Sequence, residues 1–331
     1  MSNKSKFYRI IGYIFIILLF YHLIKTTDFH IVFMHIRYIK LKTVGFLILL
    51  QLITQLLLTL QWYLISKSIV QQSSFLKILH IFTRGTIIEA ITPGAKIGGE
   101  VTRLYLLKKD LKCNTDQALS IIIIQKSISM SVLFTICIAS FLHISRNIVD
   151  YFSFVIQFVI IVICILLIVL MIMFLLFADY LLQLLSKSSN KFFTKLHHFM
   201  ISYVESTQKL TKFHWCFQFI ISTFVWLLFP FKMVVLAKAL EIRLPFMIII
   251  AITMTAYMMS MLPITPGGIG TFEGTMYTLF SIFSIESSFG ITATILFRFI
   301  TFWFVIIYSA LVTGVYETTT YIIQYFRKRN I

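Results

Sequence analysis

The sequence predicts an all-α polytopic membrane protein, with about six full spans and two Gly/Pro-broken re-entrant hairpins related as an inverted repeat. The 331 residues are 59% hydrophobic and only 12% charged, with a mean hydropathy of +0.93. Soluble domains are about half apolar and about a quarter charged, so this chain cannot hide its apolar surface in water. Two similar motifs, ITPGAKIGGE at 91–100 and ITPGGIGTFE at 264–273, interrupt the apolar sequence.

The apolar segments predict helices, because they are continuous runs of about 20 residues rather than the alternating pattern of a membrane barrel. The N-terminal run follows basic residues but has no small-residue cleavage site, so we expect a span rather than a removable signal. The expected full spans are 7–24, 43–66, 116–143, 151–178, 213–239 and 290–316.

The chain is expected to form one domain over residues 1–331. Its first half, 1–178, holds the motif at 92–103, and its second half, 213–326, holds the motif at 263–274. A basic cytoplasmic loop, 179–212, separates the halves and is typical of an amphipathic surface segment.

The two motif regions are too short or too interrupted to cross the membrane as ordinary spans, so we expect hairpins that return to their own side. With this topology, 16 Lys and Arg residues lie in inside segments and 7 in outside segments. Cytoplasmic loops carry such an excess, which predicts a multi-pass membrane protein with both termini cytoplasmic. Loop 25–42 is unusually basic for an outside loop and is expected to be an amphipathic surface helix.

The hairpins then enter from opposite sides, and broken segments at matching places in two halves mark the binding site of many transporters. Backbone groups freed by a broken helix at membrane depth require a polar cavity, and the start of the following half-helix favours an anion. Ordinary surface turns remain the alternative, although both motifs place a Glu at the same distance after Thr-Pro-Gly. The expected helix-breaking residues are Pro93, Gly94, Gly98, Gly99, Pro266, Gly267, Gly268 and Gly270.

Charged residues within the apolar regions are costly, so they are expected to face a cavity or a partner. Glu100 and Arg103 are three apart and share a helix face if 97–109 is helical, and Arg298 is a candidate partner for Glu273. Lys232 is given little weight because its side chain can reach the membrane surface. The expected substrate-binding or translocation residues are Glu100, Arg103, Glu273, Arg298, Arg84, Lys96, Lys126 and Glu89.

Basic groups outnumber acidic ones six to three in these regions, which favours an anion or phosphate in the cavity. Purely structural salt bridges remain the alternative for each pair. No catalytic motif, CxxC pair or HExxH spacing occurs, so no catalytic residue, metal or cofactor is expected. The net charge of +17 is explained by basic loops facing an anionic leaflet, and no nucleic-acid partner is expected.

The segments TPGAKIGGEVTRLYLLKK (92–109) and LPITPGGIGTFEG (262–274) resemble the two signature loops of the lysylphosphatidylglycerol synthase transmembrane-region family, also called flippase-like or UPF0104 proteins. The resemblance extends over nearly the whole chain. The family's typical forms are PGGxGGExxRxYLL and PxxPGGxGxxE, and Ala95-Lys96 departs from the first by adding a charge. The matching positions are Pro93, Gly94, Gly98, Gly99, Glu100, Arg103, Pro266, Gly267, Gly268, Gly270 and Glu273.

This resemblance implies a lipid translocase of the bacterial cytoplasmic membrane that moves an anionic or aminoacylated phospholipid, such as lysyl-phosphatidylglycerol, between leaflets. In the two-part bacterial enzymes, such exposure lowers the negative surface charge and protects against cationic antimicrobial peptides. The chain ends at Ile331 without the soluble aminoacyltransferase domain of those enzymes, so we do not expect lysyl transfer by this chain alone. The alternatives are phosphatidylglycerol lysyltransferase itself, or a partner of a separately encoded lipid synthase or glycosyltransferase. An oligomer is compatible with either.

Overall fold

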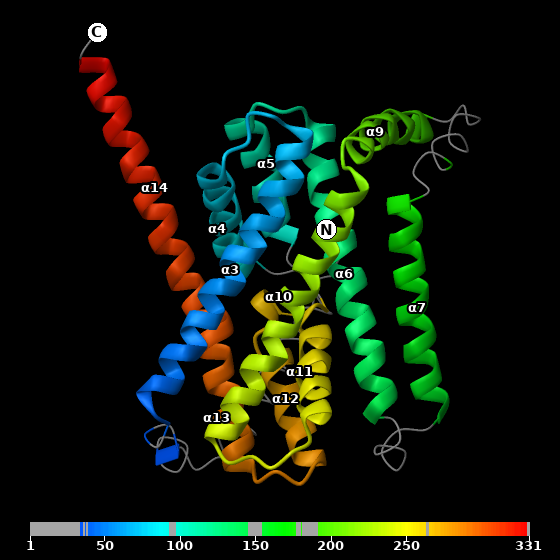
Figure 1. The fold of residues 1–331 in the computed structure, drawn as a ribbon, viewed down its shortest axis with the longest axis vertical. Coiled ribbons are helices and arrows are strands. Elements are labelled where there is room, and N and C mark those ends of the chain that lie inside the picture. The colour runs from blue at the N-terminus through cyan, green and yellow to red at the C-terminus, as the bar shows by residue number, and fades with distance from the viewer. Residues whose placement is uncertain are drawn as a thin grey trace, which may run out of the picture.

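The computed structural model is a helical bundle, and every element that it describes is a helix (Figure 1). The all-α polytopic fold is therefore confirmed for this part of the chain, while the predicted span at 7–24 lies outside it. The described residues are 34–35, 37, 39–92, 97–144, 154–176, 180, 191–262 and 265–329.

Four helical stretches of the described chain are long and apolar enough to cross a membrane. They agree with four of the predicted spans to within a few residues at most ends, although the last extends ten residues further. The helix α7 (Phe154–Leu176) lies at the position predicted for the span 151–178. The four stretches are α3 (Leu41–Ile69), Thr115–Ser140 within α6 (Thr115–Ile144), α10 (Lys212–Ala239) and the 40-residue Ser287–Phe326.

The first motif region forms a hairpin of α4 (Phe75–Ile91) and α5 (Ile97–Leu111). Ser74 begins α4 as an N-cap, because its hydroxyl accepts a hydrogen bond from the Lys77 N–H at 3.4 Å. At 1.5 Å per residue, helices of this length span about 23–26 Å. The hydrocarbon core is about 30 Å thick, so neither helix crosses it alone, and their lengths fit the predicted hairpin.

The second motif region forms a hairpin of α11 (Phe246–Ser260) and α12 (Thr271–Ile282), joined through the short 3₁₀ turn η2 (Pro266–Gly268). Three glycines of this connection have φ values of +59°, +69° and +86°. Side chains disfavour this left-handed region, which explains why the motif is rich in glycine here. The glycines are Gly267, Gly268 and Gly270.

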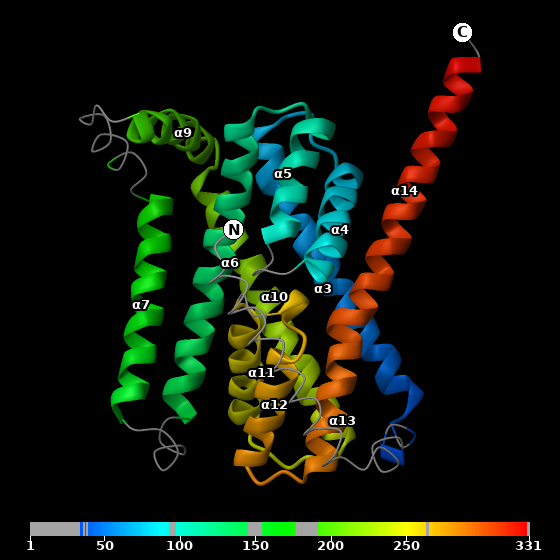
Figure 2. The same cartoon turned by 180° about the vertical axis from the view of Figure 1, so that it is seen from behind.

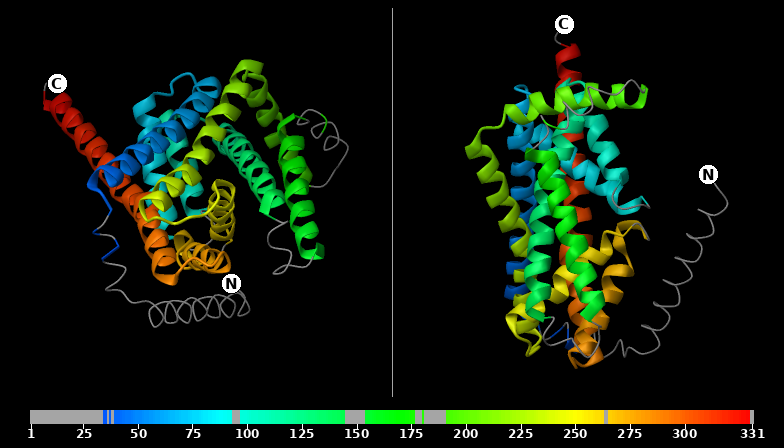
Figure 3. Two further views of the ribbon diagram at one scale, coloured as in Figure 1. Left: turned by 60° about the horizontal axis from the view of Figure 1, so that its bottom comes forward. Right: turned by 90° about the vertical axis from the view of Figure 1, so that its right-hand side faces the viewer.

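The two hairpins approach each other from opposite ends of the bundle, and their tips meet near its middle (Figure 3). A Cβ atom added to Gly267 at one tip would lie 3.3 Å from the carbonyl oxygen of Ala90 at the other. This opposed arrangement is the one that an inverted repeat predicts, and the repeat itself stays a prediction.

The connections predicted to share a side of the membrane lie at the same end of the bundle. The α3–α4 and α5–α6 connections, α9 (Lys191–Gln208) and the end of α14 (Phe304–Arg329) lie at one end (Figures 1 and 2). The α10–α11 connection and the connection from α12 to α13 (Ser287–Arg298) lie at the other. Which end faces the cytoplasm stays a prediction.

The helix α9 lies across the end of the bundle rather than along it (Figure 1). Its inner face buries Met200, Tyr203 and Val204, while the neighbouring Ile201 is exposed. This one-sided burial agrees with the amphipathic surface segment predicted for 179–212, as far as that loop is described.

Separate hydrophobic cores surround the two hairpins. One is formed mainly by α3, α4, α5, α6 and α9, and it includes Trp62 and Leu107. Another is formed mainly by α10, α11, α12 and α13, and it includes Phe272 and Phe280, both with 0% exposure. Each hairpin is therefore anchored in its own half of the bundle, while the tips between the halves carry the polar groups.

Candidate functional site

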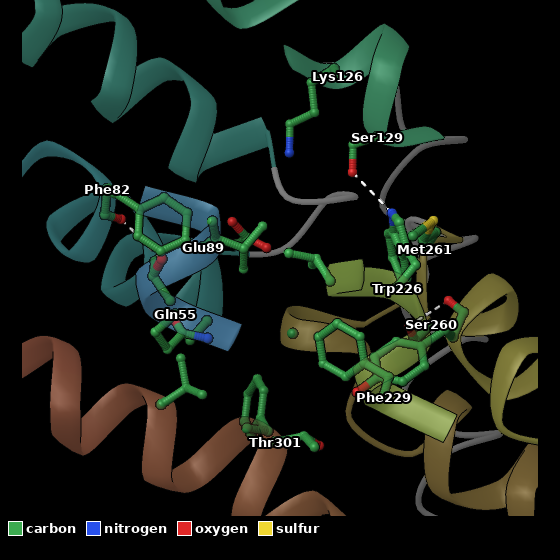
Figure 4. A pocket seen from close by; sticks show the side chains of 18 of the residues that line it. Gln55, Phe82, Glu89, Lys126, Ser129, Trp226, Phe229, Ser260, Met261 and Thr301 are labelled. Carbon is green, nitrogen blue, oxygen red and sulfur yellow. Dashed lines mark hydrogen bonds between the residues drawn. The ribbon is translucent and has the colours of Figure 1, made fainter. Parts of the chain in front are cut away.

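A cavity of about 190 Å³ lies where the hairpin tips meet, lined by residues of both hairpins and of the long helices around them. Figure 4 shows Glu89 on the first-hairpin side, Lys126 and Ser129 of α6 above, and Phe229 of α10 opposite. The cavity is thus partly aromatic and partly polar. Its charged lining residues are Glu89, Arg103, Lys126 and Arg298.

Arg103 of α5 is the centre of the first hairpin's polar cluster, with only 2% of its surface exposed. Its guanidinium donates hydrogen bonds to Glu100 Oε1 at 2.6 Å and to Glu89 Oε2 at 3.0 Å. A third bond goes to the Thr86 hydroxyl at 3.2 Å, and the Phe82 ring centroid lies 5.3 Å away. The predicted Glu100–Arg103 pair is therefore present, and it includes Glu89 of the facing helix.

Small residues let α4 and α5 approach closely enough to form this cluster. A Cβ at Gly85 would lie 2.6 Å from Arg103 Cγ, and a Cβ at Gly99 would lie 2.7 Å from Glu89 Cβ. Gly98 and Gly99 were predicted to break the helix, but both lie within the first turn of α5. That expectation is wrong for these two residues, which serve close packing instead.

Lys126 of α6 joins the first hairpin through an ion pair, with its Nζ 2.7 Å from Glu100 Oε1. The Lys126 side chain is 33% exposed, far more than the 3% of Arg103. The second carboxylate oxygen of Glu100 is buried without a hydrogen-bond partner among the described residues. The Lys126–Glu100 pair is therefore the accessible part of the cluster, and it has an unused acceptor.

The second hairpin has a matching ion pair between Glu273 of α12 and Arg298 of α13. Arg298 Nε lies 2.7 Å from Glu273 Oε1, as the sequence predicted, and an Arg298 NH₂ group donates to the Gly267 carbonyl at 2.8 Å. The other Glu273 oxygen accepts the Gly270 N–H at 2.7 Å. Arg298 and Glu273 thereby hold the glycine turn at its beginning and at its end.

A π-helical turn, η3 (Phe299–Trp303), follows Arg298 directly and separates α13 from α14. The turn places the Phe302 ring centroid 4.1 Å from the Arg298 guanidinium carbon. π-helical turns are rare overall, and those that do occur are often found at functional sites. The sequence analysis predicted one continuous span here and gave no signal for this turn.

Lys232 of α10 was given little weight because its side chain could reach the membrane surface, but the structure buries it with 0% exposure. Its Nζ donates to Gln51, and it also donates to the Thr54 hydroxyl at 3.2 Å, both on α3. The Phe229 ring centroid lies 4.3 Å from Nζ, and Phe229 lines the cavity whereas Lys232 does not. Burial is favoured over snorkelling because α3 supplies polar partners inside the bundle, so the side chain needs no route to water.

Glutamines of three long helices form further polar contacts that the sequence analysis missed. Gln125 of α6 donates to Gln61 of α3 at 3.1 Å, and Gln61 donates to the Gln218 carbonyl of α10 at 3.5 Å. All three are at most 3% exposed. Buried amides need partners, so the Gln residues within otherwise apolar spans were the available signal.

Four of the eight predicted site residues line the cavity, and Glu100 and Glu273 bind residues that do. Arg84 instead pairs with Glu317 of α14, and both side chains are nearly half exposed. His80 lies 3.4 Å from the same Glu317 carboxylate, so this is a separate cluster between α4 and α14. Lys96, Pro93 and Gly94 lie outside the described residues.

The charges around the cavity are balanced in the described chain. Among the described residues that line the cavity or pair with its lining, Arg103, Lys126 and Arg298 face Glu89, Glu100 and Glu273. Lys96, part of the excess of basic groups predicted for this region, lies outside the described residues, so that excess stays a prediction. A site with both signs of charge suits a ligand that also carries both. No cluster of three or more metal-ligating side chains is found among the described residues.

Apolar spans, two opposed hairpins and a charged cavity at their tips define a multi-pass membrane protein built around a buried polar site. The family model of the lysylphosphatidylglycerol synthase TM region matches residues 9–309, and the chain belongs to this family. Relatives include a UPF0104 membrane protein of Methanothermobacter thermautotrophicus, which is 23% identical over 78% of this chain and 80% of its own. A UPF0104 membrane protein of Methanocaldococcus jannaschii is 22% identical, over 77% of this chain and 79% of its own.

Proposed function

We propose that this protein is a lipid translocase of the cytoplasmic membrane, which moves the headgroup of an anionic or aminoacylated phospholipid between leaflets. The observation that supports this proposal is the meeting of two opposed hairpins at a cavity lined by charged residues. A headgroup can leave water and cross the apolar region only where protein groups replace its hydration. The cavity supplies such groups at the middle of the bundle.

The paired charges provide a physical route for holding and releasing a headgroup. A phosphate can replace Glu100 as the partner of Lys126, the accessible cation, and an ammonium group can bind the unused oxygen of Glu100. Lysyl-phosphatidylglycerol carries both kinds of group. Because each cation keeps a carboxylate partner when the site is empty, binding exchanges one ion pair for another, which favours release as much as capture.

The test is leaflet exchange of headgroup-labelled phosphatidylglycerol and lysyl-phosphatidylglycerol in proteoliposomes. We expect exchange by the wild type and at least a tenfold loss in Glu100→Gln and in Glu273→Gln. Glu317→Gln makes the same chemical change in the separate α4–α14 cluster and should retain exchange. Size-exclusion profiles of the purified variants establish that each one is folded.

Failure of the folded wild type to exchange either lipid would refute the proposal for these substrates. Equal exchange by Glu100→Gln, Glu273→Gln and wild type would remove the cavity from the mechanism. Formation of lysyl-phosphatidylglycerol by the purified protein with charged tRNA would identify it as an enzyme instead. Lipid exchange that requires a co-purifying synthase would identify it as a partner protein.

A translocase of lysyl-phosphatidylglycerol would lower surface negative charge, so deletion should sensitise a bacterial cell to cationic peptides.

A further inference from the structure

A second hollow, of about 470 Å³, lies between α5 and α6, and we call it the α5–α6 groove. It is lined by apolar side chains such as Val101, Leu104, Ile122 and Phe134, with Glu100 and Lys126 as the charged exceptions. The side of the groove formed by α5 is open, because Val101 is 59% exposed. The groove is therefore an apolar channel on the side of the bundle rather than at either end.

The groove and the cavity meet at shared residues, because Lys126, Met130 and Met261 line both. The ammonium of Lys126 stands at this junction, 2.7 Å from Glu100 Oε1. Beyond the junction, the cavity has charged lining residues on both hairpins, whereas the groove is apolar. A ligand that lies across the junction would thus need a polar part, a negative charge and an apolar part in that order.

We infer that the α5–α6 groove holds one acyl chain of the phospholipid whose headgroup occupies the cavity, with its phosphate at Lys126. This inference rests on the proposed function and adds the side from which the lipid enters. Lipid tails are as apolar as the groove, so the acyl chain gains little free energy by moving from the bilayer into the groove. The groove's role is to keep the tail in apolar surroundings while the headgroup passes the hairpin tips.

The test uses phosphatidylglycerol with a diazirine at the end of one acyl chain, reconstituted in proteoliposomes with the full-length protein. After illumination, peptide mass spectrometry is expected to find adducts on the α5 and α6 residues of the groove. Val101→Trp fills the groove and should reduce these adducts and lipid exchange at least fivefold. Val169→Trp, the same change at a 51% exposed position of α7, should alter neither.

The outcomes separate this inference from the proposed function. If wild type exchanges lipid but no adducts form in the groove, or if Val101→Trp exchanges lipid like wild type, the inference fails and the translocase proposal stands. If a diazirine fatty acid without a headgroup labels the groove equally well, the groove is a general apolar site and the link to the cavity is lost. Groove adducts in a wild type that exchanges no lipid would refute the proposed function alone. Leu104→Phe, a smaller change in the same groove, replaces Val101→Trp if that variant does not fold.

Discussion

The Arg298–Glu273 pair is expected to be a main support of the second hairpin, and Arg298→Met tests this directly. The substitution keeps a long side chain but removes the Nε bond to Glu273 and the bond to the Gly267 carbonyl. Glu273 would keep only its bond from the Gly270 N–H in a site where it is 17% exposed. Removing one partner of a buried ion pair costs about 3–5 kcal/mol, because the remaining charge stays buried.

The assay is equilibrium unfolding of the purified protein in mixed micelles, for Arg298→Met, Glu273→Gln and the double variant. We expect Arg298→Met to lower the free energy of unfolding by about 3–5 kcal/mol, and the double variant to lower it by less than Arg298→Met alone. The difference from additivity should exceed about 0.5 kcal/mol, the usual limit for independent sites. This double-mutant cycle measures the interaction free energy of the Arg298–Glu273 pair rather than the contribution of either residue alone.

The exposed pair Arg84–Glu317 provides a control with the same residue types. Its side chains are 46% and 48% exposed, and exposed pairs contribute only about 0–1 kcal/mol. Arg84→Met should therefore change the free energy of unfolding by no more than about 1 kcal/mol. If Arg298→Met costs no more than Arg84→Met, or if the Arg298 cycle is additive, the buried pair does not hold the hairpin and the reasoning is wrong.

Two further predictions concern packing and chemical reactivity. Gly85→Ala should lose about 1–3 kcal/mol of unfolding free energy, because its Cβ would lie 2.6 Å from the Arg103 side chain. Gly45→Ala should instead raise the free energy of unfolding by up to about 1 kcal/mol, because nothing lies within 4 Å of its added Cβ atom. Equal effects of the two substitutions would contradict the packing argument. Burial raises the pKa of the Cys113 thiol, so its thiolate forms only at higher pH than in a free cysteine. The test labels Cys113 with maleimide over a range of pH, in a variant with the other cysteines replaced by Ser. The labelling rate should reach half its maximum at a higher pH in the folded protein than in the SDS-unfolded protein. Coincident pH profiles would show that folding does not raise the pKa of this thiol.

The sequence was sufficient for the long helices because apolar length is a local property. The span predicted at 213–239 differs from α10 by one residue, and that at 116–143 differs from α6 by one residue at each end. The Glu100–Arg103 contact was also predictable, since residues three apart share a helix face. The Glu273–Arg298 pair followed from charge and motif position alone, because few charges occur at that depth.

Contacts between distant helices could not be predicted in the same way. Nothing local to Lys126 indicates that it reaches Glu100, and nothing local to Arg84 indicates Glu317. Lys232 shows the reason most clearly, because its position beside Pro230 allows either snorkelling or burial. Only the packing of α3 against α10, which brings Gln51 close, decides between them.

The π-helical turn after Arg298 fixes the rotational phase between the two ends of a 40-residue helical stretch. Each residue of an α-helix turns the chain by about 100°, so one residue more or less in the turn would rotate everything after it by that angle. Glu317 of α14 would then face away from Arg84 of α4, although no side chain of that pair had changed. Insertions and deletions of one residue between 299 and 303 should therefore be far less tolerated than substitutions at the same positions.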